Sequence, residues 1–173
     1  MTVLAANSRR ELESPEFPWP IMLAAPLLAV FLQVYLPLRL PRLNIFDLPL
    51  LVVIYFAVSR RSPISGTLTG AIVGLLQDGW AHQPFGLHGI ANTIIGFLAA
   101  SIGLKIDVDN PLTRILMIFC FTLLDSFLYL VIVRHLMAER LAWSWIHQLL
   151  RAGVNVLIGV VLFALLDRTR LQD

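Results

Sequence analysis

Six long apolar runs, separated by short polar segments, constrain this chain more than any other feature of its sequence. The runs cover residues 19–37, 45–58, 64–80, 86–104, 112–133 and 145–166. Such runs are typical of α-helices that cross a lipid bilayer, which takes about 20 residues per helix. The alternation of apolar and polar residues that a membrane β-barrel needs is absent from the sequence. The sequence therefore predicts an all-α integral membrane protein with six transmembrane helices.

The composition agrees with a membrane location and argues against other classes of protein. Of the 173 residues, 58% are hydrophobic and only 14% are charged, whereas an average soluble domain has about 25% charged residues. The net charge is +2, but the Lys and Arg residues are spread over the short connecting segments. Nucleic-acid binding needs a clustered basic patch instead. We therefore expect the lipid bilayer to surround this chain, and no nucleic-acid partner.

The polar segments at the two ends predict the domain organisation. Residues 1–18 predict a flexible tail, residues 19–168 the six-helix transmembrane domain, and residues 169–173 a second, short tail. Orientation follows from the excess of Lys and Arg that cytoplasmic loops carry.

If the first tail is cytoplasmic, the larger group of basic residues lies on the cytoplasmic side. That group is Arg9, Arg10, Arg60, Arg61, Lys105, Arg114, Arg168 and Arg170. The smaller group, on the opposite side, is Arg39, Arg42, Arg134, Arg140 and Arg151. We therefore expect both tails to be cytoplasmic, as an even number of crossings requires.

The third apolar run contains a stripe of small residues that ends at two polar ones. Gly66, Gly70 and Gly74 recur every four residues, and Gln77 and Asp78 follow. Small residues at this spacing line one side of a helix and let another helix approach closely. That second helix can belong to the same chain or to another protein, and the sequence leaves both open. We predict that these five residues form a surface that engages a partner.

Several polar side chains lie inside the apolar runs, where an ionised group costs about 2.5–3.5 kcal/mol on insertion scales. Asp125 lies near the middle of the fifth run, and Asp47 near the start of the second. His88, Asn92 and Asn155 add polar groups at other depths. Because such side chains usually face the interior of a helix bundle, we predict that these five form an intramembrane polar cluster or pocket. For Asp125 a functional and a structural role both stay open.

Two further residues in the runs have simpler interpretations. Arg151 lies close enough to the end of the sixth run for its long side chain to reach the bilayer surface. Cys120, the single cysteine, cannot form an internal disulfide and is predicted to be a small buried hydrophobic residue.

No pattern in the sequence indicates enzymatic chemistry. The segment 78–88 brings one aspartate and two histidines together, but their spacing matches no zinc motif, and H-E-x-x-H is absent. The chain also lacks G-x-S-x-G, the Walker loop and G-x-G-x-x-G. We therefore expect no catalytic residues, no metal and no cofactor.

Three neighbouring segments carry a family resemblance. They are residues 46–61 (FDLPLLVVIYFAVSRR), 65–78 (SGTLTGAIVGLLQD) and 85–97 (FGLHGIANTIIGF). They resemble the bacterial rod shape-determining protein MreD family, and the element G-x-x-x-G-L-L-Q-D is the most specific part. The resemblance covers residues 19–168. His88 and Asn92 depart from it, because smaller or more apolar residues are expected at these positions.

The resemblance implies a non-enzymatic scaffold, multi-pass in the bacterial inner membrane, that maintains rod shape. It implies MreC as the direct partner. It also implies MreB, RodA and a penicillin-binding transpeptidase in the wider elongation machinery, which organises lateral peptidoglycan synthesis.

The MreD family is also similar in fold to the substrate-binding S components of energy-coupling-factor vitamin transporters, so we expect an S-component-like bundle. This likeness leaves an alternative function, that of an S component itself. Ala25 and Ala29 match the spacing of small residues that S components often show in their first helix, although such a pair is common in membrane helices.

Overall fold

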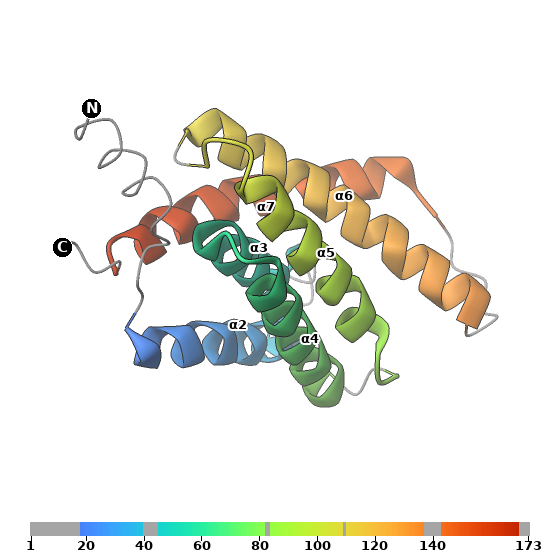
Figure 1. Ribbon diagram of the computed structural model, residues 1–173. Helices are drawn as coiled ribbons and strands as arrows, with labels where there is room; N and C mark the ends of the chain where they lie inside the picture. Colours follow the sequence, from blue (N-terminus) through green and yellow to red (C-terminus); the bar gives the residue numbers. More distant parts are fainter. Residues whose placement is uncertain (1–17, 40–44, 82–83, 109, 137–142, 170–173) are drawn as a thin grey trace, which may run out of the picture.

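The computed structural model describes residues 18–39, 45–81, 84–108, 110–136 and 143–169. These residues contain α-helices and no strand, so the prediction of an all-helical chain is confirmed. The helices are α2 (Trp19–Arg39), α3 (Leu48–Arg60), α4 (Pro63–Trp80), α5 (Leu87–Gly103), α6 (Pro111–Leu136) and α7 (Trp145–Asp167) (Figure 1). Each of them corresponds to one of the six apolar runs.

The helices differ in how well they could cross a membrane alone. Among the described residues, α2, α6 and α7 are long and apolar enough to do so. The shortest helix, α3, has 13 residues and a length of about 20 Å, against a hydrocarbon core of about 30 Å. Length and composition therefore identify three candidate spans, and crossing by all six helices stays a prediction.

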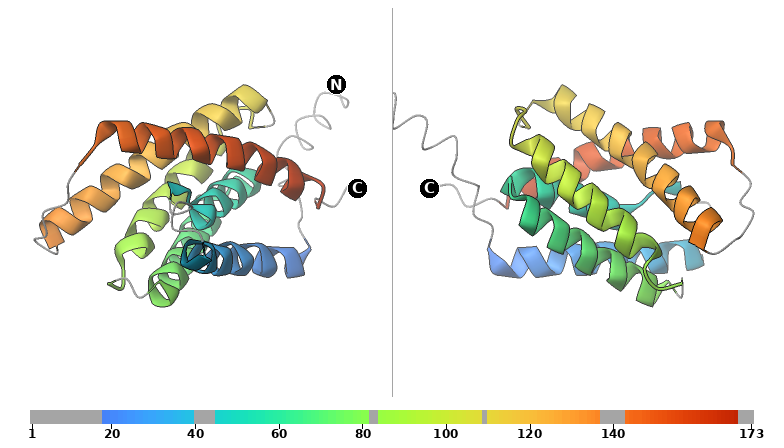
Figure 2. Two further views of the ribbon diagram at one scale, coloured as in Figure 1. Left: turned by 180° about the vertical axis from the view of Figure 1, so that it is seen from behind. Right: turned by 45° about the vertical axis from the view of Figure 1, so that its right-hand side comes forward.

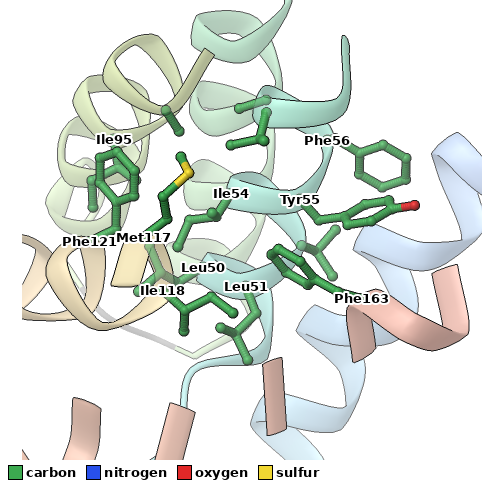
Figure 3. Packing of buried hydrophobic residues seen from close by; sticks show 14 of the residues in the cluster. Leu50, Leu51, Ile54, Tyr55, Phe56, Ile95, Met117, Ile118, Phe121 and Phe163 are labelled. Atoms are coloured by element: carbon green, nitrogen blue, oxygen red, sulfur yellow. The ribbon is translucent and has the colours of Figure 1, made fainter. Parts of the chain in front are cut away.

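α3 is the central helix of the bundle. It is buried over its whole length from Pro49 to Ser59, and it contacts α2, α4, α5, α6 and α7. Figure 3 shows large side chains of α3 packed against those of three other helices. They are Leu50, Leu51, Ile54, Tyr55 and Phe56 of α3, Ile95 of α5, Met117, Ile118 and Phe121 of α6, and Phe163 of α7. Because its neighbours cover it, this short helix meets other side chains along its whole length.

Both ends of α3 are fixed by local polar contacts. Asp47 is the N-cap residue, and its Oδ1 accepts a hydrogen bond from the Leu50 backbone N–H at 3.2 Å. At the other end Arg61 adopts the left-handed conformation with φ 48°, which ends the helix. Ser62 then caps α4, since its Oγ accepts from the Ser65 N–H at 3.4 Å. This tight connection lets α4 turn back along α3.

The remaining helices complete the bundle around α3. α4 and α5 lie side by side in Figure 1 and in the right-hand view of Figure 2, while α7 crosses the opposite side of the bundle. Cys120 of α6 is exposed, so the prediction that it is buried is wrong. α6 packs against the bundle on one side only, and apolar residues cover its outer side as well. In a membrane protein an apolar residue need not be buried against protein.

Candidate functional site

Three charged side chains from distant parts of the chain meet inside the bundle. Arg151 Nη2 donates to Asp47 Oδ2 at 2.9 Å and to Asp125 Oδ2 at 3.0 Å. Its Nη1 donates to Ser126 Oγ at 2.8 Å. The aspartate side chains are 4% and 2% exposed, and that of Arg151 is 18% exposed. We name Asp47, Asp125 and Arg151 the charge cluster, in which one guanidinium forms ion pairs with two buried carboxylates.

Each member of the charge cluster is positioned by a different element. Asp47 immediately precedes α3 and caps it, a position where a carboxylate is favoured because the first backbone N–H groups lack helical partners. Asp125 lies in the middle of α6. Arg151 lies in the second turn of α7. The ion pairs therefore connect three elements that are far apart in sequence.

Amide side chains extend the charge cluster on two sides. Asn155 Oδ1 accepts from the Asp47 backbone N–H at 2.9 Å, and its Nδ2 donates to Thr122 Oγ1 at 3.4 Å. On the other side Gln77 Nε2 donates to Asp47 Oδ1 at 3.5 Å. Asn92 Nδ2 donates to Gln77 Oε1 at 3.4 Å. All of these side chains are buried, so the hydrogen-bonded network runs from α7 through α3 and α4 to α5.

Asp78 makes a separate set of contacts at the beginning of α5. Its carboxylate accepts from the backbone N–H groups of Gly86 at 2.9 Å, His88 at 3.0 Å and Gly89 at 3.1 Å. His88 Nδ1 lies 2.8 Å from Asp78 Oδ1. The carboxylate thus satisfies donors that the first turn of a helix leaves free. Asp78 is fully buried in these contacts.

The glycine stripe of α4 packs against the backbone of α5. A Cβ placed at Gly66, Gly70 or Gly74 would lie 2.0–2.4 Å from a backbone oxygen of α5, far inside van der Waals contact. Of the two neighbours that the sequence left open, a helix of the same chain covers this side of α4. Another protein would therefore have to meet α4 on its outer side.

The structure brings most of the predicted polar residues together. Asp47, Asn92, Asp125 and Asn155 belong to one network, which also includes Gln77 from the predicted docking set. His88 pairs with Asp78 instead. Its ring also lies 5.6 Å from that of Tyr129, measured between centroids.

Arg151 is the site residue whose role the sequence interpretation missed. The sequence interpretation considered only that its side chain could reach the bilayer surface, whereas in the structure its guanidinium is turned inward to the two carboxylates. A signal was present in the sequence: two aspartates in apolar runs need a counter-charge, and Arg151 lies within such a run. What the sequence could not show is that these runs are neighbours.

A cavity of about 600 Å³ lies beside the charge cluster. Its polar lining includes Gln33, Asp47, Gln77, His88, Ser126, His147, Gln148 and Arg151, and its aromatic lining consists of Phe46, Trp80, Tyr129 and Trp143. The lining comes from one end of the bundle, where α2, α4 and α6 end and α3, α5 and α7 begin. Cavities of about 300–1,000 Å³ are of the size that holds small ligands.

The chemistry available at this site is that of hydrogen bonds and ion pairs. Within the described ranges, no group of three or more His, Cys, Asp or Glu side chains is placed to hold a metal ion. The buried polar groups mainly contact one another and the backbone. This arrangement ties helices together and forms one wall of the cavity.

Comparison with known proteins identifies the family. A family model described as rod shape-determining protein MreD matches residues 15–169, a range that includes all six helices and the whole charge cluster. No curated protein and no solved structure matches the chain. MreD proteins are shape-determining structural proteins and not a known family of enzymes. The chain therefore belongs to the MreD family and is a rod shape-determining membrane protein.

Proposed function

We propose that this protein is a non-enzymatic scaffold of the bacterial elongation machinery that binds MreC and helps to organise lateral peptidoglycan synthesis. The observation that carries the proposal is the family match over residues 15–169. MreB, RodA and a penicillin-binding transpeptidase are the proposed members of the wider complex. The buried network supports a scaffold, because its polar groups hold helices in place.

We further propose that all six helices cross the inner membrane as an S-component-like bundle, with residues 1–18 and 169–173 as cytoplasmic tails. The distribution of Lys and Arg supports this orientation. The shortness of α3 is compatible with it, because neighbouring helices surround α3. In this orientation the cavity opens on the side of the membrane away from the cytoplasm.

We place the MreC contact on the outer side of α4. Ile64, Leu68, Ile72 and Leu75 recur at intervals of three or four residues there, and all are exposed. α4 is not one of the three helices that are long and apolar enough to cross alone, so a partner helix would shield it from lipid. MreC proteins are bitopic and supply such a helix. The glycine stripe supports this surface from behind by holding α4 close to α5.

Bulky substitutions on this outer side are expected to weaken MreC binding. Leu68→Trp and Ile72→Trp should each reduce MreC retention by about fivefold or more, because an indole would prevent close packing of a partner helix. Val161→Trp on α7, where the native side chain is 69% exposed, is the matched control and should retain MreC fully. Co-purification in mild detergent measures retention, and thermal unfolding verifies that each variant is folded.

The same experiment tests the location of the MreC contact separately from the scaffold proposal. If both α4 variants retain MreC as the native protein does, the contact lies elsewhere. If the native protein retains no MreC, the scaffold proposal itself fails. The cavity favours the alternative, an S component. Co-purification of a pair of ATPase subunits in place of MreC would support that alternative.

A further inference from the structure

We infer that the cavity beside the charge cluster binds a primary ammonium group, carried either by a small soluble amine or by a lipid headgroup. The inference goes beyond the proposed scaffold function and does not depend on MreC binding. It rests on the charge of the cavity wall, on the aromatic rings in that wall, and on polar atoms there that lack partners.

The charge cluster has one more acidic group than basic groups. Asp47 and Asp125 both accept from the single guanidinium of Arg151. Their amide and hydroxyl neighbours, such as Gln77 and Ser126, carry no charge. Two buried carboxylates on one cation leave a charge that a proton or a second cation must balance. Asp47 lines the cavity, so a ligand cation there can supply that balance.

The same wall argues against an anionic ligand. Both hydrogens of Arg151 Nη2 are already directed to carboxylates, and Nη1 donates to Ser126. An anion would also meet Asp47 at close range. Of the two histidines in the wall, His88 already contacts the carboxylate of Asp78. Arg151 and His88 therefore both have acidic partners already.

Aromatic rings form part of the cavity wall. Trp80, Tyr129 and Trp143 line the cavity, and the face of an aromatic ring attracts a cation within about 6 Å. A carboxylate such as Asp47 together with aromatic rings is the environment that recognises organic ammonium groups.

Two polar atoms favour a ligand with both donor and acceptor groups over an acyl chain. Trp143 Nε1 and Gln148 Oε1 are buried, and in the part of the chain that the structure describes neither has a hydrogen-bond partner. Both residues line the cavity. A buried polar atom without a partner costs about 1–3 kcal/mol, and a polar ligand in the cavity could satisfy it. Ethanolamine combines an ammonium donor with an oxygen acceptor in one small group.

Titration calorimetry on the full-length protein in detergent tests the inference. Ethanolamine and glycerophosphoethanolamine are the cationic probes, ethylene glycol is the neutral control, and ethyl phosphate is the anionic control. A second arm compares thermal unfolding in nanodiscs of phosphatidylglycerol alone and of phosphatidylglycerol with phosphatidylethanolamine. Binding of the soluble amines indicates a small-molecule source. Stabilisation by phosphatidylethanolamine without binding of the soluble amines indicates a lipid headgroup. Either result supports the ammonium site.

Variants connect the binding to the cavity. Asp47→Asn removes the excess charge but keeps an oxygen that can cap α3, and it should weaken amine binding by about tenfold or more. Trp143→Leu removes one aromatic face without touching the charge cluster and should weaken binding by about threefold or more. Asp167→Asn removes a carboxylate at the other end of α7 and should leave binding unchanged.

The inference is overturned if neither soluble amines nor phosphatidylethanolamine act on the native protein. It is equally overturned if ethylene glycol binds as well as ethanolamine. If Asp47→Asn does not fold, unchanged binding by a folded Trp143→Leu variant also counts against the site.

Discussion

Gly70→Ala is expected to remove most of the folded protein from the membrane fraction. The added Cβ would lie 2.0 Å from the Asn92 backbone oxygen and 2.6 Å from its carbonyl carbon. Overpacking of a core usually costs about 1–3 kcal/mol when side chains can shift. Here the neighbour is the backbone of α5, so the two helices must separate, and we expect about 3 kcal/mol or more. Size-exclusion chromatography of the detergent-extracted protein measures the folded fraction.

Gly153→Ala is the matched control for this prediction. It makes the same chemical change in α7, where an added Cβ would have nothing within 4 Å. Because alanine favours a helix over glycine by about 1 kcal/mol, this variant should be as stable as the native protein or more so. If Gly70→Ala gave the same yield and unfolding temperature as Gly153→Ala, α4 and α5 could not be packed as closely as described.

Arg151→Met is expected to destabilise the bundle by about 3–5 kcal/mol, the cost of breaking a buried ion pair by removing one partner. Methionine fills a similar volume but leaves the carboxylates of Asp47 and Asp125 buried without their cation. The Ser126 hydroxyl loses its donor as well. Thermal unfolding in detergent, followed by circular dichroism, gives the change in stability.

A control and a rescue make this result specific to the charge cluster. Arg134→Met changes an exposed arginine at the end of α6 and should leave the unfolding temperature unchanged. Adding Asp47→Asn and Asp125→Asn to Arg151→Met removes the unpaired charges and should recover more than half of the lost stability. If the Arg151→Met single variant unfolded at the native temperature, the ion pairs of the charge cluster could not be what holds α6 and α7 to the start of α3.

The helices could be predicted from the sequence because each apolar run is long enough to be recognised on its own. The contacts between them could not. The spacing of Gly66, Gly70 and Gly74 indicates that some backbone approaches closely, but it does not say that this backbone is α5. Likewise the cost of burying Asp125 indicates that a counter-charge lies nearby. That this counter-charge is Arg151 depends on how α6 and α7 pack.

The polar residues near Asp78 illustrate the same limit. The sequence shows a carboxylate at the end of one helix and a histidine at the start of the next. Only the fold shows that this carboxylate accepts from three backbone N–H groups of the following turn. The cavity is less predictable still, since its lining is collected from the ends and beginnings of six helices.

Cell shape during depletion of this protein tests the central claim, that the chain is a rod shape-determining scaffold, most directly. Phase microscopy of the rod-shaped native host should show rods swelling into spheres as the protein is lost. Re-expression of the native chain should restore rods. Rods that keep their width and length after the protein has been depleted would contradict the claim.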